Sequence, residues 1–376
     1  MFQKFENKNL TADNKTRAFI ESKKLKTLWF NTGTLCNLTC KNCYIESSPK
    51  NDRLAYLSFD EFKVFVNESI QNEMGTEEIG FTGGEPFMNK DILKMIKYSL
   101  DNGFKTLVLT NAMKPMMNNR KNLNKLNHLN LSIRVSIDHY NKDKHEQIRG
   151  PNSWEPMIEG LKWLSENKFN YCLATRLMWD EDEETTRKNF KKFVDQYQLI
   201  LDVENKSQLV TFAEMDEKQD TPEITTECWD ILNKNPDTIM CSTSRMIVKK
   251  KGDENPSVIA CTLLPYKQEF DLGDTLKESM KKIYLNHPHC SKFCVLGGSS
   301  CNSIVVYNNG IEAVQIDNLT DTMTNGDNAT NMQYDSAISV DSNLNSSNAG
   351  STETNLTPGD YFAYQAFYTI TQADVA

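Results

Sequence analysis

The chain has 376 residues, of which 39% are hydrophobic and 25% charged, an ordinary globular composition in a chain long enough for two domains. It contains no run of eighteen apolar residues, and its polar start lacks the apolar core of a signal peptide. The net charge of -9 comes from the C-terminal part, because no Lys or Arg follows Lys292 while nine of the 51 acidic residues do. The neutral remainder gives no reason to expect nucleic acid as a partner.

Residues 1–26 are predicted to form a polar segment, and 27–31 the first strand, which leads into a loop with three cysteines. Cys36, Cys40 and Cys43 lie within eight residues. A structural zinc ion takes four nitrogen or sulfur ligands, and no fourth cysteine or histidine lies nearby. Three thiolates suit an iron–sulfur cluster in which one iron is left open. The alternative is a structural metal knot or a set of buried thiols.

A glycine-rich loop follows the strand predicted at 78–82. Gly83 and Gly84 allow a sharp turn and a close approach of the backbone to a ligand, and Glu85 and Pro86 complete the motif. A side chain at Gly84 is therefore expected to crowd a bound ligand.

Further strands are predicted at 105–110, 131–137, 171–178 and 208–212, and helices at 58–70, 91–100, 154–166 and 183–196. Ser58 and Glu61 form a predicted capping box at the start of the first helix. Six strands that alternate with helices predict a parallel sheet with right-handed crossovers, and hence an α/β fold. Residues at the C-terminal ends of such strands commonly form the functional site.

The three cysteines at this spacing, together with Gly83-Gly84-Glu85-Pro86 after the next strand, resemble the radical S-adenosylmethionine (radical SAM) superfamily. The resemblance covers about residues 27–215 and implies a partial (β/α)6 TIM barrel. It also implies that Cys36, Cys40 and Cys43 hold a [4Fe-4S] cluster whose open iron binds S-adenosylmethionine (SAM). One electron from that cluster would cleave SAM to methionine and a 5′-deoxyadenosyl radical, which abstracts hydrogen from the substrate.

Other site residues follow from the resemblance alone. Gly83, Gly84 and Glu85 correspond to the loop that binds the amino group of SAM. The remaining SAM contacts of the family correspond to residues at or near the ends of later strands: Asn111, Ser136 and Arg176, with Asp138 and Arg149 as weaker candidates. Each could instead serve a turn or a surface ion pair. No catalytic side chain is assigned.

Four residues that could bear chemistry are interpreted as structural. His139 and His145 lie in a charged segment, which indicates a solvated loop rather than a catalytic pair. Cys172 and Cys228 stand alone, and lone cysteines are most often small buried hydrophobic residues.

A second set of cysteines follows a helix predicted at 222–233. Cys241 and Cys261 end the strands of a predicted β-hairpin, and Cys290, Cys294 and Cys301 come later. This order resembles the SPASM or twitch extension of radical SAM enzymes, which holds auxiliary iron–sulfur clusters. One further [4Fe-4S] cluster is implied, with Cys301 as the spare thiol. A structural zinc ion held by four cysteines is the alternative.

We therefore predict a polar segment at 1–26, a radical SAM core at 27–215, a SPASM/twitch-like domain at 216–302 and a polar acidic tail at 303–376. Residues 317–358 are rich in Asn, Thr, Ser and Asp, which predicts a low-complexity, partly disordered tail.

Clustered cysteines at metal-ligand spacings favour metal binding in a reducing cytoplasm over disulfides. The sequence thus predicts a cytoplasmic radical SAM enzyme with a peptide or small-molecule substrate and an electron donor such as flavodoxin or ferredoxin. Neither nucleic acid nor a membrane is expected as a partner. The alternative is a non-catalytic iron–sulfur or zinc protein that serves as a redox sensor or scaffold. The glycine loop favours the enzyme, because a scaffold needs no SAM site.

Overall fold

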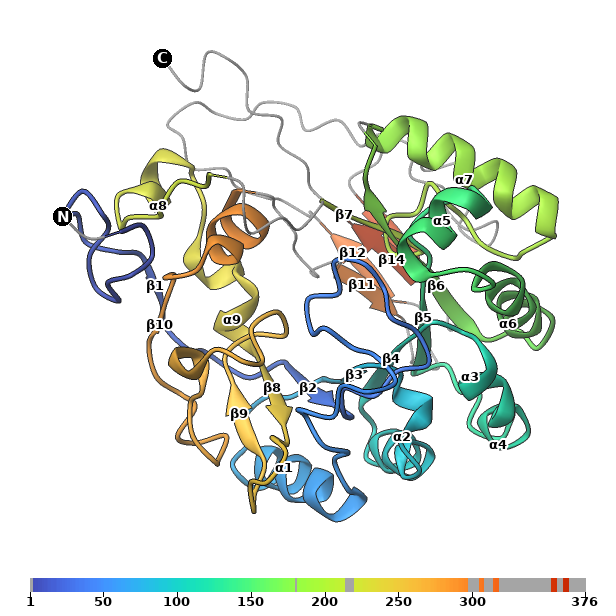
Figure 1. Cartoon of the computed structure of the whole chain (residues 1–376), viewed down its shortest axis with the longest axis horizontal. Helices are drawn as coiled ribbons and strands as arrows, with labels where there is room; N and C mark the ends of the chain where they lie inside the picture. The colour runs from blue at the N-terminus through green and yellow to red at the C-terminus, as the bar shows by residue number, and fades with distance from the viewer. Residues whose placement is uncertain are drawn as a thin grey trace. The chain divides into compact units, whose positions relative to one another are not determined.

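A mostly parallel sheet of eight strands runs through the computed structural model (Figure 1). The structure describes residues 3–179, 181–213 and 220–296 and the backbone of four later strands. The strands of the sheet, in their spatial order, are β7 Leu209–Ala213, β6 Asn170–Leu177, β5 Leu131–Ser136, β4 Lys105–Thr110, β3 Glu78–Thr82, β2 Thr27–Asn31, β8 Ser244–Val248 and β9 Ser257–Ile259. Strands β2 to β7 pair in parallel, which confirms the α/β fold and the six predicted strands.

Helices connect these parallel strands and bury their apolar faces. They are α1 Phe59–Gln71, α2 Ile92–Asp101, α3 Lys114–Asn118, α4 Arg120–Asn124, α5 Lys142–Arg149, α6 Trp154–Glu166 and α7 Glu183–Tyr197, with a 3-10 turn η1 Pro86–Met88. The capping box predicted for α1 is confirmed, because Ser58 and Glu61 each accept a hydrogen bond from the other's N–H. Phe62 of α1 packs on Phe30 of β2 with ring centroids 4.6 Å apart.

The chain after β7 joins the same sheet. Strand β8 lies parallel to β2, and β9 returns antiparallel to β8, which confirms the predicted hairpin. The other elements of this part are α8 Cys228–Ile231, η2 Pro236–Thr238, α9 Met240–Thr243, η3 Gln268–Phe270, β10 Ile283–Tyr284 and the π-helix η4 Cys290–Leu296. The prediction of a helix at 222–233 is wrong for most of that range. Thr225 instead pairs with Arg17 in an antiparallel bridge, and α8 has only four residues.

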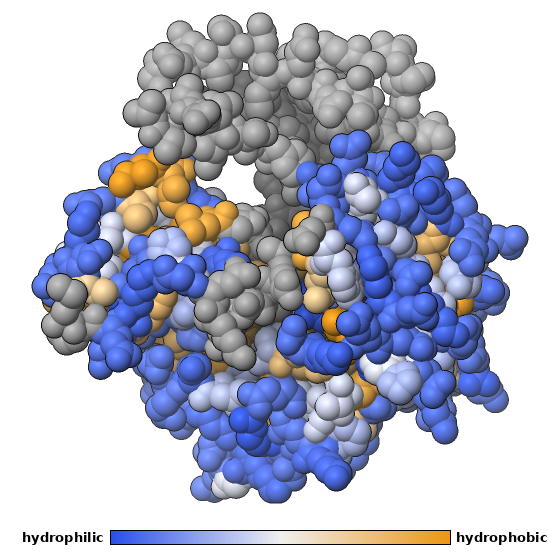
Figure 2. Space-filling view, turned by 45° about the horizontal axis from the view of Figure 1, so that its top comes forward, coloured by the Kyte–Doolittle hydropathy of each residue, from blue (hydrophilic) through white to orange (hydrophobic). Residues whose placement is uncertain are grey.

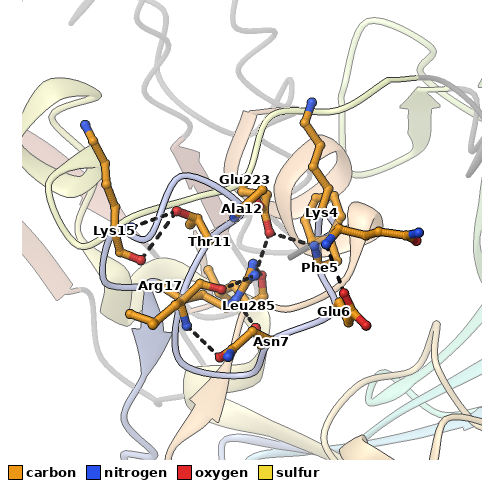
Figure 3. Close-up of polar contacts among 12 residues, drawn as sticks. Lys4, Phe5, Glu6, Asn7, Thr11, Ala12, Lys15, Arg17, Glu223 and Leu285 are labelled. Atoms are coloured by element: carbon orange, nitrogen blue, oxygen red, sulfur yellow. Dashed lines mark hydrogen bonds and ion pairs between the residues drawn. The ribbon is translucent and has the colours of Figure 1, made fainter. Parts of the chain in front are cut away.

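The N-terminal segment packs on this later part of the chain. Strand β1 Phe19–Ile20 pairs antiparallel with β10. Arg17 and Glu223 form a buried ion pair with Nη2 and Oε1 2.5 Å apart. The Glu223 carboxylate also accepts hydrogen bonds from the N–H groups of Phe5 and Ala12 (Figure 3). One buried carboxylate therefore joins three points of the segment to the later part of the chain.

The described residues divide into two units, one within Met1–Val203 and Gln208–Ser300 and the other within Glu204–Ser207 and Cys301–Ala376. In the second unit, β11 Ile304–Tyr307 pairs with β14 Tyr361–Tyr364, and β12 Val314–Asp317 pairs with β13 Glu353–Leu356. The rest of the predicted tail lies outside the described residues, and the four-part division of the chain stays a prediction.

The surface is described for the same residues. The face in Figure 2 is largely hydrophilic, with apolar side chains gathered in a few areas. No helix in the described part of the chain is long and apolar enough to cross a membrane.

Candidate functional site

The cysteine loop leaves the C-terminal end of β2 and is tied to α5. The Lys41 N–H donates to the carbonyl oxygen of Ile148 at 2.8 Å, which fixes the middle of the loop. Cys36, Cys40 and Cys43 are free thiols. Cys36 is buried, and the other two are half-buried. The loop therefore presents three thiols at the edge of the sheet where the parallel strands end.

These three thiols lie close enough to influence one another electrostatically. Burial raises the pKa of Cys36 to about 12, and Glu85, Cys40 and Cys43 act in the same direction. Burial also raises the pKa of Cys40, with Cys43 adding to the effect and Arg149 opposing it. Burial thus favours the neutral thiol, so binding of these groups as thiolates needs nearby positive charge, which the irons of a cluster supply. The residues present therefore fit a [4Fe-4S] cluster.

The glycine loop presses on the backbone of the cysteine loop. The Gly84 N–H donates to the carbonyl oxygen of Gly33 at 2.8 Å, and Gly83 has a φ of 137°. A Cβ atom at Gly84 would lie 2.2 Å from the carbonyl oxygen of Leu35. A side chain at Gly84 would therefore displace the cysteine loop itself. The crowding of a bound ligand expected from the sequence stays a prediction.

Glu85 joins the glycine loop to the end of β4. Its carboxylate is 1% exposed and accepts hydrogen bonds from the Phe87 N–H, the Thr110 hydroxyl and the Asn111 N–H, at 3.1, 2.9 and 2.9 Å. Burial raises the pKa of Glu85 to about 7, although these three bonds favour the ionised form. Glu85 is therefore a buried link between two strand ends.

Asn111 continues this link to the cysteine loop. Its Nδ2 donates to Asn37 Oδ1 at 2.9 Å and lies 3.9 Å from Cys36 Sγ. The predicted site residue at the end of β4 thus lies directly beside the first cysteine.

A buried carboxylate brings together the two arginines proposed near SAM. Asp138 is 2% exposed, and its two oxygens accept from Arg149 Nε and Arg176 Nε, each at 2.6 Å. Although burial opposes it, the two arginines lower the pKa of Asp138 to about 2. Arg149 also influences the Cys40 thiol, so the group adjoins the cysteine loop. Both arginines therefore form the ion pair of the alternative, with a buried carboxylate in place of a surface one, and their contact with SAM stays a prediction. Ser136 is half-buried at the end of β5, two residues before Asp138.

A second polar network after β5 and β6 does not stand out in the sequence. Glu181 accepts from the Tyr140 hydroxyl at 2.8 Å and from Lys144 Nζ at 2.7 Å, and it lies 3.2 Å from His139 Nε2. His139 and His145 are 4% and 0% exposed, so their interpretation as solvated loop histidines is wrong. The sequence signal that could have indicated this network is an acidic residue shortly after a strand, a position that Glu181 shares with Asp138.

The second cysteine set gathers around the β8–β9 hairpin and η4. Burial raises the pKa of Cys241 to about 12, and Cys261 contributes to this shift. Burial, Cys261 and Cys241 raise the pKa of Cys290 well above its usual value. These three thiols are therefore near neighbours. Cys294 lies four residues after Cys290 in η4, and Cys301 lies outside the described residues.

The spacing of the thiols bears on the choice between a cluster and a zinc ion. Among the described residues, no three Cys, His, Asp or Glu side chains are placed to hold one metal ion. A zinc site would gather four ligands within about 2.0–2.3 Å of a single ion. In an iron–sulfur cube the thiolates bind different irons and stand farther apart. The cluster and the zinc ion therefore both stay predictions for these cysteine sets.

The two cysteine sets approach each other near Tyr44. Burial raises the pKa of Tyr44 to about 12, and Cys43 and Cys261, one from each set, both act in the same direction. The Tyr266 hydroxyl, in the loop after Cys261, donates to the carbonyl oxygen of Ile45 at 2.8 Å. The later part of the chain is thus bonded to the cysteine loop.

Comparison with known proteins agrees with this geometry. Residues 30–194 match the family model described as "Radical SAM superfamily". The matched stretch includes the cysteine loop, the glycine loop and the Asp138 group. It is therefore a domain of the radical SAM superfamily.

Two curated relatives are similar to part of the chain. The antilisterial bacteriocin subtilosin biosynthesis protein AlbA of Bacillus subtilis (strain 168) is 30% identical over 150 residues, 39% of this chain and 32% of that protein. An AdoMet-dependent heme synthase of Oleidesulfovibrio alaskensis is 27% identical over 165 residues, 44% of this chain and 39% of that protein. Both matches thus span less than half of the relative's length. Among solved structures, Streptococcus suis SuiB bound to S-adenosylmethionine has a TM-score of 0.47 at 14% identity, covering 68% of this chain and 64% of that one.

Proposed function

We propose that this protein is a radical SAM enzyme with a [4Fe-4S] cluster on Cys36, Cys40 and Cys43 and SAM at the open iron. The position of all three thiols in one loop after β2, against the glycine loop and beside Asn111, carries the proposal. The match of residues 30–194 to the superfamily supports it. When bound, the cluster and SAM supply a 5′-deoxyadenosyl radical that takes hydrogen from the substrate.

The protein's own residues bind and orient SAM in this proposal. The sheet from β2 to β7 is then the partial (β/α)6 barrel, and its C-terminal edge is the active-site mouth. The residues proposed to contact SAM lie at this edge: Gly83, Gly84, Glu85, Asn111, Ser136 and Arg176. Asp138 holds the Arg176 guanidinium in place through the 2.6 Å ion pair.

We further propose that residues 216–302 form a SPASM/twitch-like domain after a core of 27–215. Its second [4Fe-4S] cluster would be bound by Cys241, Cys261, Cys290 and Cys294, with Cys301 as the spare thiol. The mutual influence of the first three thiols supports this assignment.

The substrate class is proposed as a peptide or a small molecule. The two relatives, at similar identity, are a bacteriocin biosynthesis protein and a heme synthase, so neither class is favoured. An electron donor such as flavodoxin or ferredoxin would reduce the first cluster in the cytoplasm.

The test is anaerobic reconstitution with iron and sulfide, reduction with dithionite, and quantification of 5′-deoxyadenosine in the presence of SAM. Wild-type protein should form it, and the variant with Ala at Cys36, Cys40 and Cys43 should not. Cys228→Ala is the matched control, because Cys228 is half-buried and belongs to neither set, so it should behave as wild type. Iron-loaded wild-type protein that forms no 5′-deoxyadenosine would instead favour a redox sensor or scaffold.

A further inference from the structure

Three arginines are buried in the part of the chain that the structure describes: Arg17, Arg187 and Arg245. Arg17 pairs with Glu223 at 2.5 Å (Figure 3), and Arg187 pairs with Glu183 at 2.7 Å. Arg245 differs from both. It is 1% exposed, and its hydrogen bonds within the described residues reach no carboxylate.

Among the described residues, Arg245 donates only to neutral acceptors. Its Nη1 donates to the carbonyl oxygens of Cys241 and Ser244, each at 2.6 Å. Its Nε and Nη2 donate to the Ser279 carbonyl oxygen at 3.2 and 3.0 Å, and Nη2 also reaches the Ser22 hydroxyl. The hydrogen-bonding capacity of the guanidinium is satisfied, but its charge is not. A buried charge without a counter-charge is strongly unfavourable, so this position calls for an anion nearby.

A second cation, Lys234, contacts the backbone at Cys294, the last described cysteine of the set. Lys234 is half-buried, and its Nζ donates to the carbonyl oxygens of Cys294 and Val295 at 3.3 and 2.6 Å. No carboxylate among the described residues pairs with it. Each cation thus binds the backbone of one proposed cluster ligand, Arg245 at Cys241 and Lys234 at Cys294.

We infer that Arg245 and Lys234 are the fixed positive charges of the second cysteine centre, and that they raise the reduction potential of its cluster. The inference rests on the second cluster proposed above. Four thiolates make such a centre an anion, and reduction adds one more negative charge. Nearby cations therefore stabilise the reduced form more than the oxidised form. Both side chains are positioning residues that act through this charge.

A purely structural role makes a different prediction. The same carbonyl groups lie at the ends of α9 and η4, where cationic side chains commonly cap a helix. A capping role depends on the number and geometry of the N–H donors. Arg245→Lys keeps the charge but loses donors, whereas Arg245→Gln loses the charge and keeps an N–H donor. These two variants separate the roles.

The experiment uses the full chain with Ala at Cys36, Cys40 and Cys43, so that only the second cluster remains. After anaerobic reconstitution, the reduced fraction is followed by EPR in a redox titration. Arg245→Gln should lower the ratio of reduced to oxidised cluster at a fixed potential by about tenfold, which is about 59 mV for one electron. Lys234→Gln should shift it in the same direction, and Arg245→Lys should stay near the parent.

The matched control removes a compensated charge. Arg187 is buried like Arg245 but pairs with Glu183 at 2.7 Å on α7, so the double variant Arg187→Gln, Glu183→Gln leaves the net charge unchanged. Its reduction potential should equal that of the parent.

The remaining outcomes overturn the inference in distinguishable ways. An unchanged ratio in Arg245→Gln and Lys234→Gln, with iron retained, overturns it and leaves the proposed function intact. Equal shifts in Arg245→Lys and Arg245→Gln assign a structural role instead. If Arg245→Gln fails to load iron, the half-buried Lys234→Gln decides alone. A parent that carries zinc or no iron removes the second cluster from the proposed function, and the inference with it.

Discussion

Asp138 supplies the negative charge that pairs with two arginines beside the cysteine loop. Its carboxylate holds Arg149 at the end of α5 and Arg176 on β6. Asp138→Asn would leave both guanidinium groups largely buried without their carboxylate. Breaking a buried ion pair by removing one partner costs about 3–5 kcal/mol, so we expect a clearly lower melting temperature at pH 7. Asp143→Asn, on the exposed first turn of α5, should cost less than about 1 kcal/mol. Equal losses in the two variants would contradict this role.

His145 gives a prediction for the pH dependence of stability. Burial, with Arg149 adding to the effect, lowers its pKa to about 3, whereas an unfolded chain takes up the proton near pH 6.5. The unfolded state therefore binds more protons between these values, so the stability contributed by neutral His145 is complete above about pH 6.5 and is lost as the pH falls.

His145→Leu removes this titration and two ring nitrogens without a hydrogen-bond partner among the described residues. Between pH 7 and pH 5, the melting temperature of the wild type should fall further than that of the His145→Leu variant. The exposed His128→Leu should follow the wild type. Parallel melting curves for all three proteins would show that His145 does not titrate on unfolding in this range.

At the scale of elements, the loops after β2 and β3 are built as one structure. The Glu85 N–H donates to the carbonyl oxygen of Leu35 at 3.2 Å, and the Gly84 N–H is bonded to the same loop. Gly84→Ala places a methyl group against this backbone, so it should lower iron loading as well as SAM binding. Gly252→Ala is the control, because Gly252 has a φ of 93° but nothing within 4 Å of its Cβ position. It should cost about 1 kcal/mol of strain and load iron normally. Full iron content in Gly84→Ala would refute the coupling of the two loops.

Alternation of apolar strands and amphipathic helices predicted all six parallel strands because these signals are local. The same holds for the Ser58 capping box, which involves residues three positions apart. The helix predicted at 222–233 failed for the opposite reason. Thr225, within this range, pairs with Arg17, which lies far earlier in the sequence, and no local pattern reports such a partner.

The site residues divide in the same way. Cys36, Cys40, Cys43 and the glycine loop are contiguous motifs, and the sequence predicted that they belong together. Asp138 was only a weak candidate, because its importance comes from Arg176 on the next strand. The hydrogen bonds of Arg245 reach no carboxylate within the described part of the chain, and no local sequence pattern reports this.

At the scale of the whole first unit, the later part of the chain is not a separate appendage. Strand β8 extends the sheet beside β2, and Phe293 of η4 stacks on Phe212 of β7 with ring centroids 6.0 Å apart. The N-terminal segment adds β1 to β10. Chain segments at both ends of the unit therefore complete the surroundings of the second cysteine set. Loss of the N-terminal contacts should affect iron binding by that set.

Glu223 tests this dependence, since Arg17, Phe5 and Ala12 all donate to its carboxylate. Although burial opposes it, the bonds from Ala12, Phe5 and Arg17 lower the pKa of Glu223. The stability from this carboxylate is therefore present above its usual pKa near 4.5 and is lost as the pH falls below it. Glu223→Gln should imitate that loss at neutral pH, because it leaves Arg17 buried without its counter-charge, at a cost of about 3–5 kcal/mol.

The loosened segment should become a protease substrate. Trypsin should cut Glu223→Gln after Lys8, Lys15 or Arg17 well before it cuts the wild type, as followed by mass spectrometry. Glu227→Gln is the matched control, because Glu227 pairs with Lys15 at 3.4 Å on the surface, where an ion pair contributes only about 0–1 kcal/mol. If both variants resist trypsin as the wild type does, β1 and its pairing with β10 hold the segment without the buried ion pair. If Glu223→Gln also loses iron from the second cysteine set, the N-terminal segment is part of the structure that supports that set.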